Sequence, residues 1–147
     1  MSKADSPIDV LLFAGPFEVR GTSAYTLRLA QHAINYGINT CVVCPDAAKV
    51  DPRIRSNLEM REYRNLNVPL LGQIVLRLVK QELLKQPPDL IHIQSRHVLP
   101  QGQWLARKIK RPFILTVNDY LQSDEKLRID LRWCRGIITV SESVKKD

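Results

Sequence analysis

The sequence predicts an α/β fold, a Rossmann-like doubly wound and mainly parallel sheet of about six strands with helices on both faces. Short apolar runs alternate with amphipathic segments from one end of the chain to the other. The runs are nearly continuous in apolar residues, which is typical of strands that are buried on both faces. The chain has 147 residues, enough for one ordinary domain. We therefore expect a single domain over residues 1–147, with an ordered core over residues 8–143.

The first strand and helix are expected over residues 8–13 and 22–36. The apolar run of the strand breaks at Gly15-Pro16, and Gly37 suits a left-handed helix cap. A loop with glycines and a helix N-terminus thus follows a buried strand, which is where open α/β sheets bind anionic ligands. The apolar residues of the helix recur at helical spacing: Ala24, Leu27, Ala30 and Ile34.

The middle of the chain contains the clearest amphipathic segment. A second strand is expected over residues 38–44, where Pro45 stops it, and a third over residues 58–63, where the alternation is only partial. Apolar residues at helical spacing predict a helix over residues 70–86, since Pro87-Pro88 cannot continue it.

The last third repeats the strand and helix pattern. Ser123 and the acidic residues that follow it are a helix-start signal. The expected elements are strands over residues 89–94, 113–117 and 136–140, and helices over residues 100–110 and 124–133.

Composition indicates a globular protein with anionic partners. Apolar residues make up 44% of the chain and charged residues 25%, and the net charge is +7. No apolar run approaches the ~20 residues of a membrane span, and residues 1–7 lack the apolar segment of a signal peptide, so we expect a cytoplasmic protein. The basic cluster Arg107, Lys108, Lys110 and Arg111 has two interpretations, a solvated helix end or a patch for an anionic membrane surface at the inner face of the membrane. No aromatic residues interleave with it, so nucleic acid is not expected.

The three cysteines are expected to be reduced and structural. Cys41 and Cys44 have C-x-x-C spacing, but they lie within an expected strand rather than at a helix N-terminus. A zinc site would need a second ligand pair, and none has suitable spacing, so no metal is expected. Cys134, at the end of the expected last helix, is interpreted in the same way.

Four segments resemble family 4 retaining glycosyltransferases, which have the GT-B fold of two Rossmann-like domains facing a cleft. Each segment alone is unspecific, but all four occur in the family's order and cover nearly the whole chain. The segments are residues 20–25 with 35–43 (RGTSAY and NYGINTCVV), 88–95 (PDLIHIQS), 111–119 (RPFILTVND) and 134–143 (CRGIITVSES). The resemblance implies the N-terminal, acceptor-side half of such an enzyme, without the C-terminal domain that binds the donor.

The resemblance also implies where the site residues lie. Asn118 and Asp119 stand where many members have a histidine near the reacting sugar, but asparagine cannot transfer protons at neutral pH. Arg20 stands where the family usually has the first of two glycines. The implied residues are Gly15, Arg20, Gly21 and Thr22 in a loop at the diphosphate and acceptor, and Gln94, Ser95, Ser141 and Glu142 at the cleft edge.

Several of these residues have an equally simple structural interpretation. Arg20 could point into solvent, and Asp119 and Ser141 could cap the turns that follow them. Gln94 and Ser95 end a strand and are better placed than His92, inside the strand, to face a cleft. His92 is predicted to be a hydrogen-bonded core residue, and His32 and His97 are predicted to lie on the surface.

The expected function is transfer of a hexosyl group from a nucleotide diphosphate sugar to a sugar or lipid-linked acceptor, with retention. No cofactor is expected, and the isolated domain is expected to be inactive. Two alternatives stay open. One is a nucleotide- or dinucleotide-binding domain of another enzyme class, for which Asp46 after the second strand is partial support. The other is a non-catalytic module that docks through its basic surface.

Overall fold

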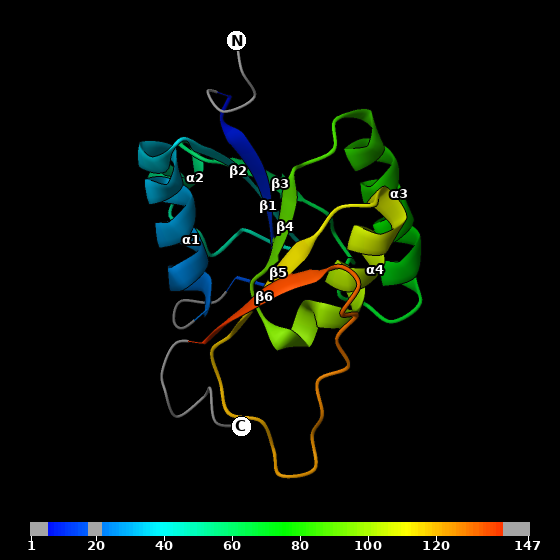
Figure 1. Cartoon of the computed structure of the whole chain (residues 1–147). Helices are drawn as coiled ribbons and strands as arrows, with labels where there is room; N and C mark the ends of the chain where they lie inside the picture. Colours follow the sequence, from blue (N-terminus) through cyan, green and yellow to red (C-terminus); the bar gives the residue numbers. More distant parts are fainter. Residues whose placement is uncertain (1–5, 18–21, 140–147) are drawn as a thin grey trace.

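The structure is a computed structural model that describes residues 6–17 and 22–139 (Figure 1). Six strands form one sheet in the order β3-β2-β1-β4-β5-β6, and every neighbouring pair is parallel. This confirms the predicted fold class. The strands are β1 (Ile8–Phe13), β2 (Ile38–Cys44), β3 (Glu59–Glu62), β4 (Leu90–Ile93), β5 (Phe113–Val117) and β6 (Cys134–Thr139).

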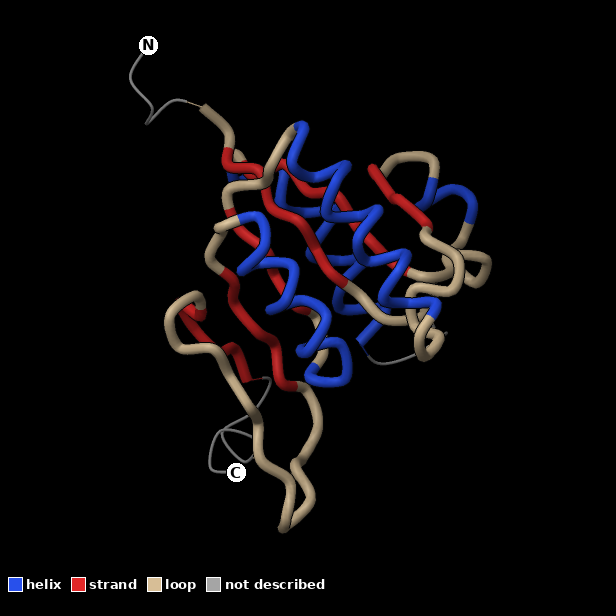
Figure 2. The backbone as a smooth tube through the Cα atoms, turned by 90° about the vertical axis from the view of Figure 1, so that its right-hand side faces the viewer, coloured by secondary structure: helices blue, strands red, loops and turns tan. Residues whose placement is uncertain are grey.

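Helices cover both faces of the sheet (Figures 1 and 2). On one face lie α1 (Thr22–Ala33) and the short α2 (Pro52–Arg55), and on the other lie α3 (Leu71–Lys85) and α4 (Leu99–Ile109). Two 3₁₀ turns, η2 (Ile34–Tyr36) and η3 (Arg96–Val98), complete the structure.

Alternate residues of each strand supply two separate apolar cores. Leu11 and Phe13 of β1 pack with α3 and α4, whereas Leu12 between them packs on the α1 side. The α3–α4 core is the larger and holds residues such as Ile91, Phe113 and Leu105.

The chain reverses its direction of travel across the sheet between β1 and β4. β1 pairs with β2 on one side and with β4 on the other. The pairing extends to the last residues, because the Ala14 amide donates to the Val43 carbonyl (2.9 Å) and the Gln94 amide to the Phe13 carbonyl (3.0 Å). Such a reversal leaves a crevice at the carboxyl ends of the two strands, so the candidate site lies there.

Most expected elements form at or close to the predicted bounds. Residues 8–13, 38–44 and 113–117 are strands as predicted, and the third strand is shorter. The first helix tightens into η2 before it ends at Gly37, whose φ of 71° confirms the left-handed cap. The helix α2 was not predicted, although Asp51 before Pro52 is a helix-start signal: its Oδ1 accepts from the Arg53 amide at 2.8 Å.

The predicted helix over residues 124–133 is wrong, because this segment consists of turns and extended chain. Gln103 of α4 explains the difference. Its amide donates to the Arg128 carbonyl (2.9 Å) and its oxygen accepts from the Asp130 amide (3.1 Å), so it takes backbone groups that a helix would pair internally. Leu127 and Ile129, two residues apart, both pack on the core, as extended chain allows.

The cysteines are free, as predicted. Burial raises the pKa of both the Cys41 and the Cys44 thiol to about 12, which makes them inert at neutral pH. Cys134 is the first residue of β6 rather than part of a helix.

Two buried hydrogen-bonded pairs join the elements that meet at the candidate site. The Thr26 hydroxyl of α1 donates to Gln94 Oε1 at the end of β4 (3.0 Å). His92 Nε2 lies 2.7 Å from the Thr116 hydroxyl, which joins β4 to β5. His92 is therefore the hydrogen-bonded core residue that was predicted, and burial lowers its pKa to about 4.

Thr26→Val is expected to destabilise the chain by about 1–3 kcal/mol, because it leaves the buried Gln94 oxygen without this donor. Urea unfolding followed by circular dichroism measures the change. Thr40→Val, at a half-buried position of β2, is the matched control and is expected to change stability by less than about 0.5 kcal/mol. Equal effects of the two substitutions would contradict the importance of the Thr26–Gln94 bond.

His92 is expected to make the fold sensitive to acid. Below pH 6.5 the unfolded histidine takes up a proton, but the folded one stays neutral until about pH 4. The free energy of unfolding should therefore decrease as the pH is lowered from 6.5 to about 4. The contribution of this residue is about 1.4 kcal/mol per pH unit.

Urea unfolding at several pH values measures this slope. His92→Gln should flatten it between pH 6.5 and pH 4, while His32→Gln, on the exposed side of α1, should leave it unchanged. A slope that His92→Gln does not alter would contradict the assignment.

Candidate functional site

The candidate site lies along the carboxyl edge of β1, β4 and β5. After β1 the chain turns inward, and the side chain of Phe17 is buried. Gly15 lies in this turn, and a Cβ added to it would meet only the Val98 side chain at 3.5 Å, an ordinary contact. The protein itself therefore does not require glycine here, and the open side of Gly15 leaves its backbone accessible.

The N-terminus of α1 faces the same edge. The Thr26–Gln94 bond places the first two turns of the helix beside the end of β4. Amide groups in the first turn of a helix have no partner within the helix and favour an anion. Thr22 is the first residue of this helix. Arg20 and Gly21, and also Ser141 and Glu142, lie outside the described residues.

Gln94 and Ser95 are buried at the end of β4 and form hydrogen bonds within the protein there. Gln94 is fully buried, and its amide nitrogen donates to the His92 carbonyl (3.2 Å). The Ser95 hydroxyl accepts from the His97 amide (3.2 Å) and caps η3. In this structure both side chains thus stabilise the end of β4 rather than project from it.

Asp119 is the centre of an ionic cluster that the sequence did not predict. Arg96 Nε donates to Asp119 Oδ1 (2.8 Å), and His97 Nε2 lies 3.2 Å from Oδ2. Arg96, whose side chain is only 11% exposed, also pairs with Glu125. The cluster joins the end of β4 to the segment that follows β5.

This cluster keeps Asp119 ionised. Partial burial alone would raise the pKa of the carboxyl, but the hydrogen bonds and positive charge of Arg96 and His97 outweigh it and lower that pKa. Asp119 is thus an ion-pair partner rather than a turn cap. Arg96 and Glu125 had no signal in the sequence, because their partners are more than 20 residues away. His97 is exposed, as predicted, but it lies against Asp119.

Asn118 lies next to this cluster and is half-buried at the end of β5. Its amide can donate and accept hydrogen bonds at a sugar hydroxyl. The edge therefore combines a helix N-terminus, which favours an anion, with an amide and an ion-paired carboxylate, which suit the hydroxyls of a polar ligand.

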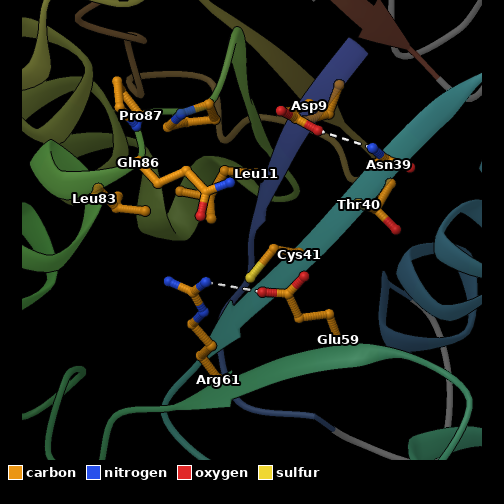
Figure 3. A pocket seen from close by; sticks show the side chains of 12 residues that line it. Asp9, Leu11, Asn39, Thr40, Cys41, Glu59, Arg61, Leu83, Gln86 and Pro87 are labelled. Atoms are coloured by element: carbon orange, nitrogen blue, oxygen red, sulfur yellow. Dashed lines mark hydrogen bonds and ion pairs between the residues drawn. The ribbon is translucent and has the colours of Figure 1, made fainter. Parts of the chain in front are cut away.

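A half-open pocket lies at the opposite, amino edge of the sheet (Figure 3). It has a volume of about 100 Å³, and its wall includes Cys41 and the Arg61–Glu59 pair, whose nitrogen and oxygen are 2.8 Å apart. The Cys41 thiol is protonated at neutral pH, and both charged side chains satisfy each other. The pocket also contains an amide and a carboxylate, Asn39 and Asp9, which hydrogen-bond each other at 3.0 Å, but none of its described lining residues belongs to a helix N-terminus.

Two general findings apply to the described part of the chain. No group of three or more His, Cys, Asp or Glu side chains there is arranged to hold a metal ion. None of the helices in that part is both long enough and apolar enough to cross a membrane.

Solved glycosyltransferase structures share this fold. A glycosyltransferase from Rickettsia africae matches with a TM-score of 0.71 and 17% identity, over 95% of this chain and 38% of its own. The lipopolysaccharide outer core galactosyltransferase WaaB matches with a TM-score of 0.69 and 13% identity, over 95% of this chain and 41% of the WaaB chain. HepE from Anabaena, in complex with UDP and glucose, matches with a TM-score of 0.68 and 15% identity, over 95% of this chain and 40% of the HepE chain.

The chain thus spans about two fifths of the length of these structures. At such low identity the match shows a common fold, the Rossmann-like domain of GT-B enzymes. No curated protein matches the chain at the sequence level.

The sequence itself matches the model of one protein family, described as Glycosyltransferase Family 4, over residues 19–147. The match extends over most of the chain and includes the residues of α1, β4, β5 and β6 that build the carboxyl edge. The chain belongs to Glycosyltransferase Family 4.

Proposed function

We propose that the chain is the acceptor-side domain of an enzyme that transfers a hexosyl group from a nucleotide diphosphate sugar, with retention. The observation that carries this proposal is the family match over residues 19–147. The residues of the carboxyl edge support it, since they suit a polar anionic ligand. A structural neighbour, HepE, was solved with UDP-glucose and with UDP and glucose.

The edge residues have distinct roles in this proposal. The first-turn amides of α1 bind the donor diphosphate, and Gly15, Arg20, Gly21 and Thr22 are assigned to the diphosphate and the acceptor. Asn118 hydrogen-bonds a sugar hydroxyl, and Asp119, held by Arg96, fixes the orientation of the segment after β5. Ser141 and Glu142, which follow β6 in the sequence, are assigned to the same ligand.

Catalysis then depends on positioning and on electrostatic stabilisation of the leaving diphosphate. Asn118 transfers no proton at neutral pH. The proposal requires no cofactor or metal ion. It places the groups that hold the nucleotide and the sugar of the donor on a second Rossmann-like domain, while this chain contacts the diphosphate, so this chain alone has no transferase activity.

The acceptor is a sugar or a lipid-linked sugar, and the enzyme works at the cytoplasmic face of a membrane. The basic end of α4 is consistent with this location, but its charges are not equivalent. Arg107 lies 3.8 Å from Asp130, and the Arg111 Nε atom is buried. Lys108 and Lys110 are exposed and are the stronger candidates for contact with anionic lipid.

A nuclear magnetic resonance titration of the isotope-labelled chain tests the proposed ligand class. UDP-glucose or a GDP-sugar should shift the amide signals of Gly15, Ser95 and Asn118 at the carboxyl edge, because the anionic diphosphate approaches the α1 N-terminus there. NAD is the comparison ligand. Tighter binding of NAD, or shifts confined to the amino-edge pocket around Cys41, would contradict the proposal, and so would sugar transfer by this chain alone.

Asn118→Ala is expected to lower kcat/KM about tenfold in an enzyme that contains both domains, the loss of one neutral hydrogen bond in the transition state. Asn118→His retains a donor and should keep more activity. The control is Asn35→Ala, in η2 at the far end of α1. Initial-rate kinetics measure these changes. An unchanged kcat/KM for Asn118→Ala would remove Asn118 from the site.

A further inference from the structure

The solvent-facing side of α3 is apolar. Leu71, Ile74 and Leu78 recur at helical spacing and are each at least half exposed, at 50%, 59% and 52%. They lie on the side of the helix opposite to Leu76, Val79 and Leu83, which are buried in the core. Leu70 before the helix and Leu84 near its end add further exposed apolar surface. The helix therefore has an apolar stripe on each side, and the core explains only one of them.

Positive charge is concentrated around this stripe. α3 and α4 lie side by side on one face of the sheet (Figure 2). Residues 71–85 and 99–111 contain seven basic residues and one acidic residue, whereas the whole chain contains 22 and 15. Nearly all of the net charge of +7 thus lies on these two helices and the residues that end α4. The basic residues are Arg77, Lys80, Lys85, Arg107, Lys108, Lys110 and Arg111.

The one acidic residue, Glu82, is exposed one helical turn beyond Leu78 and offsets one of the seven positive charges. Glu82 accepts a hydrogen bond from the Tyr63 hydroxyl, on the side that faces β3. On α4, the Lys108 ammonium lies 5.8 Å from the centre of the Trp104 ring. Arg77 and Trp104 line the groove between the two helices. Aliphatic, cationic and aromatic groups therefore face solvent on the same side of the molecule.

We propose that this α3–α4 surface, formed by Leu71, Ile74, Leu78, Arg77, Lys85 and Lys108, binds an anionic lipid bilayer. The aliphatic side chains enter the boundary between headgroups and acyl chains, and the cations contact the anionic headgroups. An amphipathic helix with apolar and basic residues on its exposed side is the combination that binds such an interface.

The charge argues against the other occupants. Two copies of the chain that met through this surface would bring two strongly basic patches together, which disfavours a dimer. A nucleic acid would leave the aliphatic stripe without a partner. Membrane binding by this surface extends the membrane location given in the proposed function. Vesicle binding is measured separately from sugar transfer, so failure of the one is distinguishable from failure of the other.

Co-sedimentation with vesicles tests the proposal. The chain should bind vesicles made of equal parts of phosphatidylcholine and phosphatidylglycerol, and binding should weaken at high salt. Vesicles of phosphatidylcholine alone should bind little of it. Equal binding to both vesicle types, or no binding to either, would overturn the proposal.

Variants assign the binding to this surface. Ile74→Ser with Leu78→Ser should lower the partition coefficient at least about tenfold, because two aliphatic side chains no longer leave water. Arg77→Gln with Lys108→Gln should lower it by about tenfold or more, and that loss should disappear at high salt. Circular dichroism checks that each variant is folded.

The controls change the same residue types elsewhere. Leu131→Ser replaces an apolar residue that is 83% exposed and follows the extended segment before β6. Lys49→Gln with Arg53→Gln removes two exposed charges near α2, on the other face of the sheet. These controls should bind as the unchanged chain does, and an equal loss in both sets would overturn the assignment. Light scattering that finds a dimer dispersed by Ile74→Ser with Leu78→Ser would also overturn it, in favour of a second copy.

Discussion

The pairing of β1 with β2 on one side and β4 on the other determines where every described candidate residue lies. Parallel strands need crossover connections, so each strand end is followed by a loop on the same edge of the sheet. The reversal between β1 and β4 separates the loops on either side of it and leaves space for a ligand. The loop after β1, the start of α1, and the residues after β4 and β5 meet at this edge because of that strand order alone.

Buried polar contacts hold this edge in place. Gln94 binds α1 through Thr26, His92 binds β5 through Thr116, and Arg96 binds the segment after β5 through Asp119. Each contact joins two elements that lie far apart in sequence. Buried polar groups specify a structure strongly because an unpaired group is costly, so these contacts restrict how the edge can move. Asn118, which we propose contacts a ligand, directly follows β5, one of the strands that these contacts join.

The two faces of the sheet have different characters. The α1–α2 face encloses the smaller core and supplies the helix N-terminus of the candidate site. The α3–α4 face encloses the larger core and also carries most of the positive charge and an exposed apolar stripe. The sheet separates these surfaces, so the ligand edge and the α3–α4 surface can act at the same time.

The sequence by itself determined the order and type of the strands, because apolar runs and proline or glycine stops are local signals. It also determined the family, through four motifs in the right order. It placed Asn118 and Asp119 at a strand end, but their partners could not be predicted. The predicted helix over residues 124–133 was wrong because Gln103, on another element, pairs with the backbone there.

Only the tertiary structure decided what the polar residues do. Gln94 became a buried support rather than an edge residue, and Arg96 and His97 joined Asp119, because these outcomes depend on side chains that are distant in sequence. The second apolar side of α3 was visible in the sequence only as additional leucine and isoleucine. Burial is a property of the assembled layers, so the packing of α3 against the sheet decided which of its apolar residues remain in solvent.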